Sequence, residues 1–283
     1  MTIRELVKQG EQILKEFGIR DAKIDARLLI LSLLECDVTQ LLLSQEQIAA
    51  EHLKASFMYL IAKRTQGIPL QYITSEQSFM GLDFYVDERV LIPRQDTEIL
   101  VEKTIKLINK KKQPIEGIEI GTGSGCIAIS LVYYVQNLKM TSIDVSPKAL
   151  EVAQKNCKTY NCNEKIKFIE SDLFENVKNG KVYDFVISNP PYISIEDHAT
   201  LEREVLECEP RLALTDEGDG LKFYRDISKQ AKTYLKRGGF IAFEIGYNQG
   251  ITVREILENE GYSHVEVIKD LARKDRVVIA YKL

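Results

Sequence analysis

From Ile115 to its end, the chain alternates short apolar segments with longer segments of helical periodicity. The apolar segments read GIEI, MTSIDV, KIKFIE, YDFVISN and GFIAFEI, and helices are predicted from Ser124, from Pro147 and up to about Leu235. Because parallel strands need a crossover connection, usually a helix, this alternation predicts a mostly parallel sheet with helices on both faces. The final segments, SHVEVI and DRVVIAYKL, predict two adjacent strands, one of them antiparallel.

The first part of the chain carries helical patterns only. Apolar residues from Ile3 to Phe17 recur at helical spacing, and further helices are predicted over 25–34 and 46–64. Since each apolar face must be buried against another, residues 1–67 predict a small helical bundle.

A linker follows the predicted bundle, because Gly67 and Pro69 break the last helix. Strand-like residues lie on both sides of the polar Ser75–Gln77, so residues 68–90 predict a β-hairpin linker. Residues 91–283 then form the second domain, which holds the motifs described below. A length of 283 residues is comfortable for two domains.

Charge and composition weigh against some classes of function. The formal net charge is -4, and residues 1–75 carry equal numbers of basic and acidic residues. Phosphate contacts supply much of the affinity of nucleic-acid-binding proteins, so no stable nucleic-acid complex is expected. The run Lys110–Lys112 is interpreted as a solvated helix end.

The five cysteines are odd in number and form no CxxC pair, and the three histidines are scattered. We therefore expect no disulfide framework and no metal site, and we interpret all eight as core or surface residues of a protein in a reducing compartment. No apolar run approaches the roughly 20 residues of a membrane span, and the N-terminus lacks the pattern of a secretory signal. A cytoplasmic protein without a membrane partner is the expectation.

A glycine-rich loop is the first motif that carries chemistry. Gly121, Thr122, Gly123 and Gly125 follow a short apolar strand and precede a helix, which is the context of a nucleotide-binding loop. A dinucleotide-binding GxGxxG fingerprint would need glycine where the chain has Cys126. The GxGxG spacing, with an acidic residue two places before it, is more typical of S-adenosyl-L-methionine-binding folds.

Three carboxylates follow successive predicted strands. Asp144 closes the second strand, where it can accept hydrogen bonds from both ribose hydroxyls, and Glu119 closes the first, placed to receive an ammonium group through water. Asp172, with Leu173 beside it, follows the third strand, where an adenine amino group would lie. Taken alone, Asp172 is more often a helix cap than a ligand. Together with the glycines, the acids favour a cofactor site.

The second motif is the tetrapeptide Asn189-Pro190-Pro191-Tyr192, directly after a buried strand. Ligands of open α/β sheets bind outside the carboxyl ends of the strands, where this loop and the glycine loop both lie. The prolines fix the direction of the Pro190 carbonyl, and the Asn189 side chain supplies a second acceptor oxygen. Tyr192 supplies a flat ring that can stack on a planar group. The alternative is a proline-rich turn without function.

These acceptors suit methyl transfer to an amide or amino nitrogen. An amide nitrogen is a poor nucleophile because its lone pair is delocalised into the carbonyl. Asn189 Oδ1 and the Pro190 carbonyl can accept both N–H bonds and turn the lone pair toward the methyl group. Positioning and electrostatics then carry catalysis, and no dedicated general base is required.

At these residues the chain resembles the bacterial release-factor glutamine methyltransferases. Three further stretches resemble that family: LIPRQDTE over 91–98, EPRLAL over 209–214 and GDGL over 218–221. The helical N-terminal part and the hairpin also resemble the family's layout, so the resemblance covers essentially the whole chain. Gln95 stands where the family usually has proline, and ARKDR over 272–276 replaces a usual glycine-containing turn.

The resemblance implies a class I S-adenosyl-L-methionine methyltransferase fold, Rossmann-like, with a mostly parallel seven-stranded sheet. It implies methyl transfer to N5 of the glutamine in the GGQ motif of peptide-chain release factors, with a helical domain that helps to recognise them. Asn189 and Pro190 would contact the glutamine, Asp144 the ribose, and Asp172 would lie near the adenine. Arg94 and Thr97 would shape the substrate pocket; a helix start with Thr97 as its cap is the alternative.

Other functions remain open at this point. A nucleic-acid methyltransferase acting on adenine N6 or cytosine N4 would present the same two N–H bonds to the tetrapeptide, but it would need a basic surface. A dinucleotide oxidoreductase leaves the tetrapeptide unexplained. A binding module without catalysis is disfavoured by the intact acids.

Overall fold

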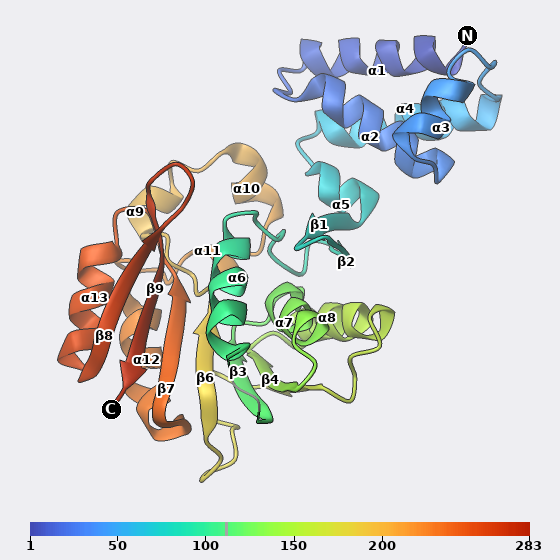
Figure 1. The fold of residues 1–283 in the computed structure, drawn as a ribbon. Helices are drawn as coiled ribbons and strands as arrows, with labels where there is room; N and C mark the ends of the chain where they lie inside the picture. The colour runs from blue at the N-terminus through green and yellow to red at the C-terminus, as the bar shows by residue number, and fades with distance from the viewer. Residues whose placement is uncertain (111–112) are drawn as a thin grey trace. The chain divides into compact units, whose positions relative to one another are not determined.

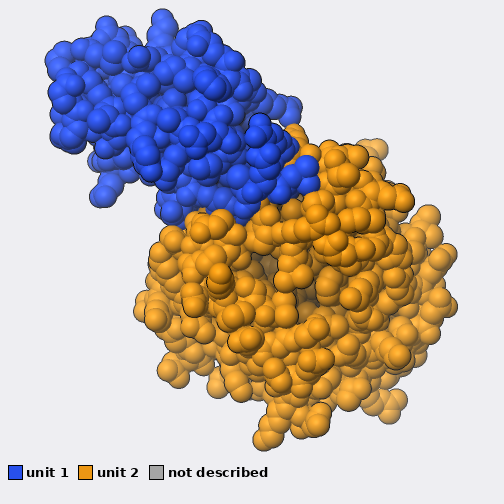
Figure 2. All heavy atoms as spheres, turned by 180° about the vertical axis from the view of Figure 1, so that it is seen from behind, with its two compact units in different colours: residues 1–76, 203–208 blue, residues 77–202, 209–283 orange. Residues whose placement is uncertain are grey.

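The computed structural model describes residues 1–110 and 113–283 (Figure 1). Lys111 and Lys112, in the run interpreted as a solvated helix end, lie outside the described residues. Residue contacts divide the chain into two compact units, coloured separately in Figure 2. Unit 1 consists of 1–76 and 203–208, and unit 2 of 77–202 and 209–283. Within the described ranges, no helix is long and apolar enough to cross a membrane.

Unit 1 is built from helices, as the periodicity predicts. They are α1 (Ile3–Glu16), α2 (Ala22–Leu34), α3 (Val38–Ser44), α4 (Glu51–Thr65), α5 (Leu70–Thr74) and α10 (Arg203–Cys208). A capping box begins α1, because Thr2 accepts from the Glu5 amide and the Glu5 side chain accepts from the Thr2 amide. The core contains fully buried residues from three helices: Leu6, Leu14, Leu29, Ile30 and Phe57. The sequence did not predict α3 or the recruitment of α10.

A buried arginine explains why α10 belongs to unit 1. Arg64 donates to Asp25 Oδ2 at 2.7 Å and to Glu204 Oε2 at 2.8 Å, so it joins α4 to α2 and to α10. It also donates to the Ile68 carbonyl at 3.0 Å. A buried charge is tolerated when it is paired and hydrogen-bonded, and Glu204 supplies part of that compensation.

Unit 2 is built on a seven-stranded sheet in the order β5-β4-β3-β6-β7-β9-β8. The strands are β3 (Ile115–Ile120), β4 (Leu138–Asp144), β5 (Ile166–Glu170), β6 (Tyr183–Ser188), β7 (Leu235–Glu244), β8 (Tyr262–Lys269) and β9 (Asp275–Lys282). β5, β4, β3, β6 and β7 are parallel, and β9 is antiparallel to β7 and β8. The predicted parallel sheet with two adjacent C-terminal strands is confirmed.

Helices cover both faces of this sheet (Figure 1). One core contains residues of α6 (Thr97–Ile108), α7 (Cys126–Tyr134) and α8 (Pro147–Thr159). The other contains residues of α12 (Lys222–Tyr234) and α13 (Gly250–Asn259). Two short helices, α9 (Ile195–His198) and α11 (Arg211–Leu214), lie between β6 and α12 in the chain.

The strand order reverses direction at β3. The chain runs outward from β3 to β4 and β5, then returns to place β6 on the other side of β3. At such a switch point the loops after two neighbouring strands diverge and leave a crevice for a ligand. The two loops concerned are the glycine loop after β3 and the tetrapeptide after β6.

The hairpin forms later in the chain than the sequence predicts. β1 (Glu76–Phe79) and β2 (Leu82–Tyr85) pair across Met80 and Gly81, which both have positive φ. The strand expected over LQYIT is wrong, because those residues form α5, which begins after Pro69 and ends at a left-handed Ser75. A β-hairpin turn favours two left-handed residues, and Gly81 supplies one without strain.

One expectation about the cysteines is also wrong. The structure pairs Cys157 with Cys162 as a disulfide, with 5.3 Å between their Cα atoms. Both side chains are buried, at the end of α8 and in the residues that follow it. Cys36 and Cys126 are free thiols, and the Cys208 thiol donates to the Gly67 carbonyl at 3.5 Å. Among the described residues, no group of His, Cys, Asp and Glu side chains is arranged to hold a metal.

Candidate active site

A cavity of about 390 Å³ lies at the switch point of the sheet, within unit 2. Its volume falls in the roughly 300–1,000 Å³ range of small-molecule sites. Most of the residues singled out from the sequence line it: Arg94, Thr97, Gly121, Thr122, Gly123, Asp144, Asp172, Leu173, Asn189, Pro190 and Pro191. Glu119, Gly125 and Tyr192 do not line the cavity.

The glycine loop is held in a conformation that needs its glycines. Gly121, Gly123 and Gly125 have φ values of 81°, 54° and 81°, a region that side chains with a Cβ rarely adopt. The Gly121 and Thr122 amides both donate to the Ile143 carbonyl, at 2.8 and 3.0 Å. The loop is therefore fixed to the end of β4 and bends its backbone around the cavity.

Asp144 anchors the glycine loop from the end of β4. Its Oδ2 accepts from the Gly123 amide at 2.8 Å, and its Oδ1 accepts from the Ser146 amide at 2.9 Å. Burial raises the pKa of this carboxyl, while backbone donors at Gly123, Ser146 and Val145 lower it. A carboxylate has about four lone-pair sites, so each oxygen of Asp144 retains capacity for one more donor.

Glu119 is a fully buried acid at the end of β3. The Ser142 hydroxyl donates to Oε2 at 2.9 Å, and Oε1 has no partner among the described residues. Burial raises the pKa of this carboxyl to about 8. The Thr122 hydroxyl, in the cavity wall, is likewise buried without a described partner. Unpaired buried polar groups are costly, so the Thr122 hydroxyl, which lines the cavity, indicates a polar ligand there.

The amide of Asn189 is oriented by a contact that the sequence did not reveal. Its Nδ2 donates to Thr97 Oγ1 at 3.2 Å, at the start of α6. Thr97 is 2% exposed, so this hydroxyl is a fixed acceptor rather than a solvated one. With Nδ2 engaged, Oδ1 is the atom of this amide that remains to accept a hydrogen bond from a ligand.

Tyr192 lies behind the cavity wall. Its hydroxyl donates to Glu244 Oε1 at 3.4 Å, and burial raises the pKa of the phenol. Glu244 is the last residue of β7 and is 1% exposed. The predicted stacking of Tyr192 on an acceptor group therefore stays a prediction, since its ring is not among the residues lining the cavity.

The segment over 209–221 forms a support for the tetrapeptide. Asp216 Oδ1 accepts from the Gly218 and Gly220 amides at 2.8 and 3.0 Å, which closes a tight turn. Gln249 Nε2 donates to the Tyr192 carbonyl at 3.0 Å and to the Gly220 carbonyl at 3.3 Å. The turn and the tetrapeptide are thus joined through one side chain from the start of α13.

Gly220→Ala should destabilise this support. Gly220 has a φ of 74°, and a Cβ there would collide with the Tyr192 backbone carbonyl. The strain and the collision should together cost about 2 kcal/mol or more, which lowers the melting temperature by roughly 4–8 °C. Thermal unfolding of Gly220→Ala beside Gly218→Ala tests this, because a Cβ at Gly218 makes only ordinary contacts. Equal melting temperatures would contradict it.

Arg94 is joined to the same segment by an ion pair. Its Nη2 lies 2.5 Å from Glu209 Oε1, and Glu209 Oε2 accepts from the Ile92 amide at 3.4 Å. The Glu209 side chain is 2% exposed, whereas Arg94 is 40% exposed and lines the cavity. Arg94, in the LIPRQDTE stretch, therefore lines the cavity, while Glu209, in the EPRLAL stretch, compensates its charge.

Four residues of this arrangement were missed by the motif analysis: Glu209, Asp216, Glu244 and Gln249. Glu209 and the Asp216 turn fall within or beside stretches that resemble the family, and that resemblance was the available signal. Glu244 lies near the end of a predicted strand, as Glu119 does. An acid at that position was a weaker indication of a site residue. Gln249 carries no signal, because its role depends on three segments that are distant in the sequence.

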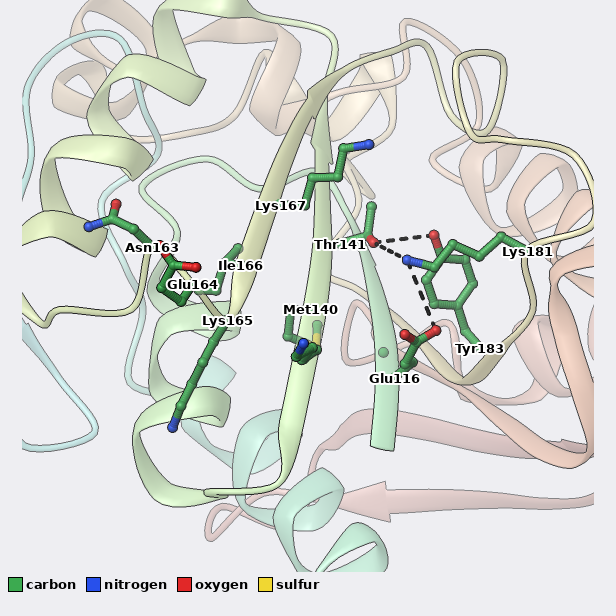
Figure 3. A pocket seen from close by; sticks show the side chains of 12 residues that line it. Glu116, Met140, Thr141, Asn163, Glu164, Lys165, Ile166, Lys167, Lys181 and Tyr183 are labelled. Atoms are coloured by element: carbon green, nitrogen blue, oxygen red, sulfur yellow. Dashed lines mark hydrogen bonds and ion pairs between the residues drawn. The ribbon is translucent and has the colours of Figure 1, made fainter. Parts of the chain in front are cut away.

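A second, smaller cavity of about 180 Å³ lies at the opposite ends of β3, β4 and β5. Lys181 contacts Thr141 at 3.5 Å and Glu116 at 4.0 Å, and Tyr183 donates to Thr141 at 3.2 Å. Figure 3 shows that Lys165 and Lys167 point away from each other and from that group. Because its cations do not converge, this cavity lacks the arrangement of an anion site.

The sheet order, the antiparallel β9 and the glycine loop at the switch point define a class I methyltransferase. Solved structures agree with this class at the level of the fold. A methyltransferase from Pyrococcus furiosus has a TM-score of 0.53 at 20% identity over 72% of this chain and 90% of its own. The hMettl16 catalytic domain in complex with a MAT2A 3'UTR hairpin has a TM-score of 0.58 at 20% identity. The match covers 79% of this chain and 81% of that domain.

Sequence comparison narrows the class to a family. Residues 5–74 match the PrmC N-terminal domain, and residues 95–221 match the methyltransferase small domain. The release factor glutamine methyltransferase of Fusobacterium nucleatum is 40% identical over 98% of this chain and 78% of its own length. The release factor glutamine methyltransferase of Clostridium acetobutylicum is 39% identical over 100% of this chain and 99% of its own length. The chain belongs to the release factor glutamine methyltransferase family.

Proposed function

We propose that this protein transfers a methyl group from S-adenosyl-L-methionine to N5 of the glutamine in the GGQ motif of peptide-chain release factors. The observation that carries the proposal is the Asn189 amide, whose Nδ2 is held by Thr97 so that Oδ1 is left as an acceptor at the cavity wall. The relatives are named release factor glutamine methyltransferases, and this name supports a release-factor glutamine as the methyl acceptor. The proposal implies a cytoplasmic protein whose helical domain, residues 1–67, contacts the release factor.

The residues of the cavity fit the cofactor. Asp144 retains acceptor capacity for ribose hydroxyls, and Glu119, which lies behind the cavity wall, would receive an ammonium group through water. Asp172 and Leu173 line the cavity beyond β5, where they would lie beside the adenine. Gly121, Thr122, Gly123 and Gly125 shape the backbone that would enclose the methionine part.

When bound, the cofactor supplies an electrophilic methyl group on a sulfonium sulfur. Asn189 Oδ1 and the Pro190 carbonyl accept the two N–H bonds of the glutamine amide, which directs the nitrogen lone pair away from them. As the bond to the methyl carbon forms, the bond from that carbon to sulfur would break and leave the thioether S-adenosyl-L-homocysteine, while positive charge would develop on nitrogen, where these two oxygens stabilise it. The nitrogen then loses one proton to water, so no side chain needs to act as a base.

The proposed reaction is tested with methyl-labelled cofactor and a bacterial release factor, beside a copy whose GGQ glutamine is replaced by alanine. Label on the first and none on the second is the expected result. DNA and RNA are included as acceptors, since label on them alone would replace the proposal with nucleic-acid methylation.

Cofactor affinity should increase as pH rises from 6 to 8. The pKa of Glu119 is raised to about 8, so below that pH the carboxyl is protonated and must lose its proton to pair with an ammonium group. The dissociation constant should therefore fall by up to about tenfold per pH unit. Calorimetric titration measures this, with Glu119→Gln as the variant whose affinity should be weaker and nearly independent of pH. A flat profile for the unaltered protein would refute the role of Glu119.

A further inference from the structure

Asn156 is a buried amide on α8 that belongs to none of the motifs in the sequence. It is 2% exposed, and its side chain contacts two separate segments of unit 2. One is the strand β2, where Oδ1 accepts from the Tyr85 amide at 2.8 Å and Nδ2 donates to the Tyr85 carbonyl at 2.9 Å. The other is the glycine loop, where Nδ2 donates to the Ser124 carbonyl at 2.9 Å. One side chain therefore joins α8, the hairpin and the glycine loop.

We propose that Asn156 is a positioning residue for the cofactor, which holds the end of the glycine loop by binding the Ser124 carbonyl. The inference rests on the proposed function, since it concerns the loop that would enclose the methionine part of S-adenosyl-L-methionine. Asn156 is not among the residues that line the cavity, so it would act through the loop and not by direct contact with the cofactor.

The amide of Asn156 uses both of its N–H bonds in this arrangement. Its nitrogen has two backbone carbonyls as acceptors, at Tyr85 and at Ser124, while Oδ1 accepts from the Tyr85 amide. Turning the amide by about 180° would place its oxygen against both carbonyls and leave neither with a donor. The orientation is therefore fixed, and a buried amide with all of its donors satisfied rigidifies the backbone that it contacts.

The peptide group between Ser124 and Gly125 is thereby held at both ends. Asn156 binds its carbonyl, and the Gly125 amide donates to the Thr122 carbonyl at 2.9 Å. Gly125 is the N-cap of α7 and has a φ of 81°. Because Thr122 and Ser124 line the cavity, the direction of this peptide group sets the shape of the wall against which the cofactor would lie.

Close packing of α8 against the glycine loop supports the same role. A Cβ added to Gly125 would lie 3.1 Å from the Ala153 Cβ and 3.3 Å from the Ala153 Cα. Ala153 precedes Asn156 by three residues, so both lie on the same face of α8. Small residues at Gly125 and Ala153 therefore let this face approach the loop, and the Asn156 amide reaches Ser124 from it.

The segment after β2 belongs to the wall of the same cavity. Arg89, four residues after Tyr85, lines the cavity and donates to Glu151 Oε2 on α8 at 2.8 Å. The chain is thus bonded to α8 at Tyr85 and again at Arg89. Asn156 therefore fixes the glycine loop relative to a second segment that lines the cavity.

The first test measures cofactor affinity by calorimetric titration with S-adenosyl-L-methionine. Asn156→Leu removes all three hydrogen bonds, and Asn156→Asp keeps the shape and the acceptor but sets a carboxylate against the two carbonyls. Each variant should raise the dissociation constant by about tenfold or more, since the loop loses a buried anchor. At saturating cofactor, kcat with the release factor should change less than about threefold, because the contact between Asn189 and Thr97 is kept.

Tyr160→Phe is the matched control, because Tyr160 anchors the same strand at Asp83. Its hydroxyl accepts from the Asp83 amide at 2.7 Å and donates to the Asp83 carbonyl at 2.6 Å, and phenylalanine keeps the ring that packs on Phe84. This variant loosens β2 but leaves the Asn156 bond to the loop, so its dissociation constant should stay within about twofold. Equal losses of affinity in Asn156→Leu and Tyr160→Phe would overturn the inference, as would an unchanged affinity in Asn156→Leu.

Hydrogen exchange of the unaltered protein, followed by NMR, is a second test that needs no variant to fold. The Tyr85 amide is bonded to Asn156, whereas the Asp83 amide is bonded to Tyr160. Cofactor that orders the glycine loop should slow exchange at Tyr85 by about threefold or more beyond any change at Asp83. Equal changes at the two amides would contradict the inference. Absence of cofactor binding by the unaltered protein would count against the proposed function instead, so the two failures are distinguishable.

Discussion

Replacing Asn189 with alanine should lower turnover by about 10²- to 10³-fold, with cofactor affinity changed no more than a few-fold. The substitution removes one of two acceptors that would stabilise positive charge on the amide nitrogen as it is methylated. Removing a single preorganised polar group from the site where charge develops typically has an effect of this size. The small effect on the cofactor follows because its proposed contacts are made chiefly by other residues, Asp144 and Glu119 among them.

Two measurements on one preparation check this prediction. Single-turnover label transfer to the release factor reports the chemical step, and calorimetry reports cofactor binding. Asn259→Ala, at the end of α13, serves as the control and should match the unaltered protein in both. If Asn189→Ala loses cofactor affinity in proportion to turnover, Asn189 maintains the loop rather than orienting the acceptor.

Replacing Asp144 with alanine should weaken cofactor binding by roughly 10²-fold. A hydrogen bond to a charged group contributes about 1.5 kcal/mol or more, and the proposed ribose contact contains two. The same carboxylate accepts from the Gly123 and Ser146 amides, so its loss also releases the glycine loop. Both effects act on affinity, and kcat at saturating cofactor should fall much less.

The matched comparison for Asp144 is Asp144→Asn. The asparagine retains one acceptor oxygen and should recover part of the affinity that alanine loses. Thermal unfolding of both variants without cofactor separates the loop contribution from the ribose contribution. Equal calorimetric affinity of Asp144→Ala and the unaltered protein would remove Asp144 from the cofactor site.

The sequence predicted those parts of the site that depend on local order along the chain. Gly121, Gly123 and Asn189 could be placed because each follows a buried strand closely, and parallel strands bring their carboxyl ends to one edge of the sheet. The strand and helix patterns also alternate over consecutive segments of the chain. They could therefore predict the sheet and its antiparallel C-terminal strand. Whether these residues bind the cofactor and the glutamine stays a prediction until the variants are measured.

Contacts between distant segments could not be predicted in this way. The pairing of Arg94 with Glu209 spans 115 positions, and no local pattern encodes it. The LQYIT segment has strand-like residues, yet it folds as α5 and buries Leu70 in the helical core. Tertiary packing overrides intrinsic β preference, which is weak and dependent on context. Thr97 was noted only as a pocket residue or a cap, because its contact with Asn189 joins residues 92 positions apart.

The assignment of α10 to unit 1 has a consequence for synthesis on the ribosome. The helices up to α5 emerge first, yet Glu204, which pairs with the buried Arg64, is made only after the tetrapeptide strand β6 has been translated. During that interval the nascent helical unit carries Arg64 with Asp25 as its remaining carboxylate partner. Domains generally fold as units in the order of their synthesis, but here the first unit is completed by a segment inserted in the second. The helical unit can therefore complete its fold only after part of unit 2 has been synthesised.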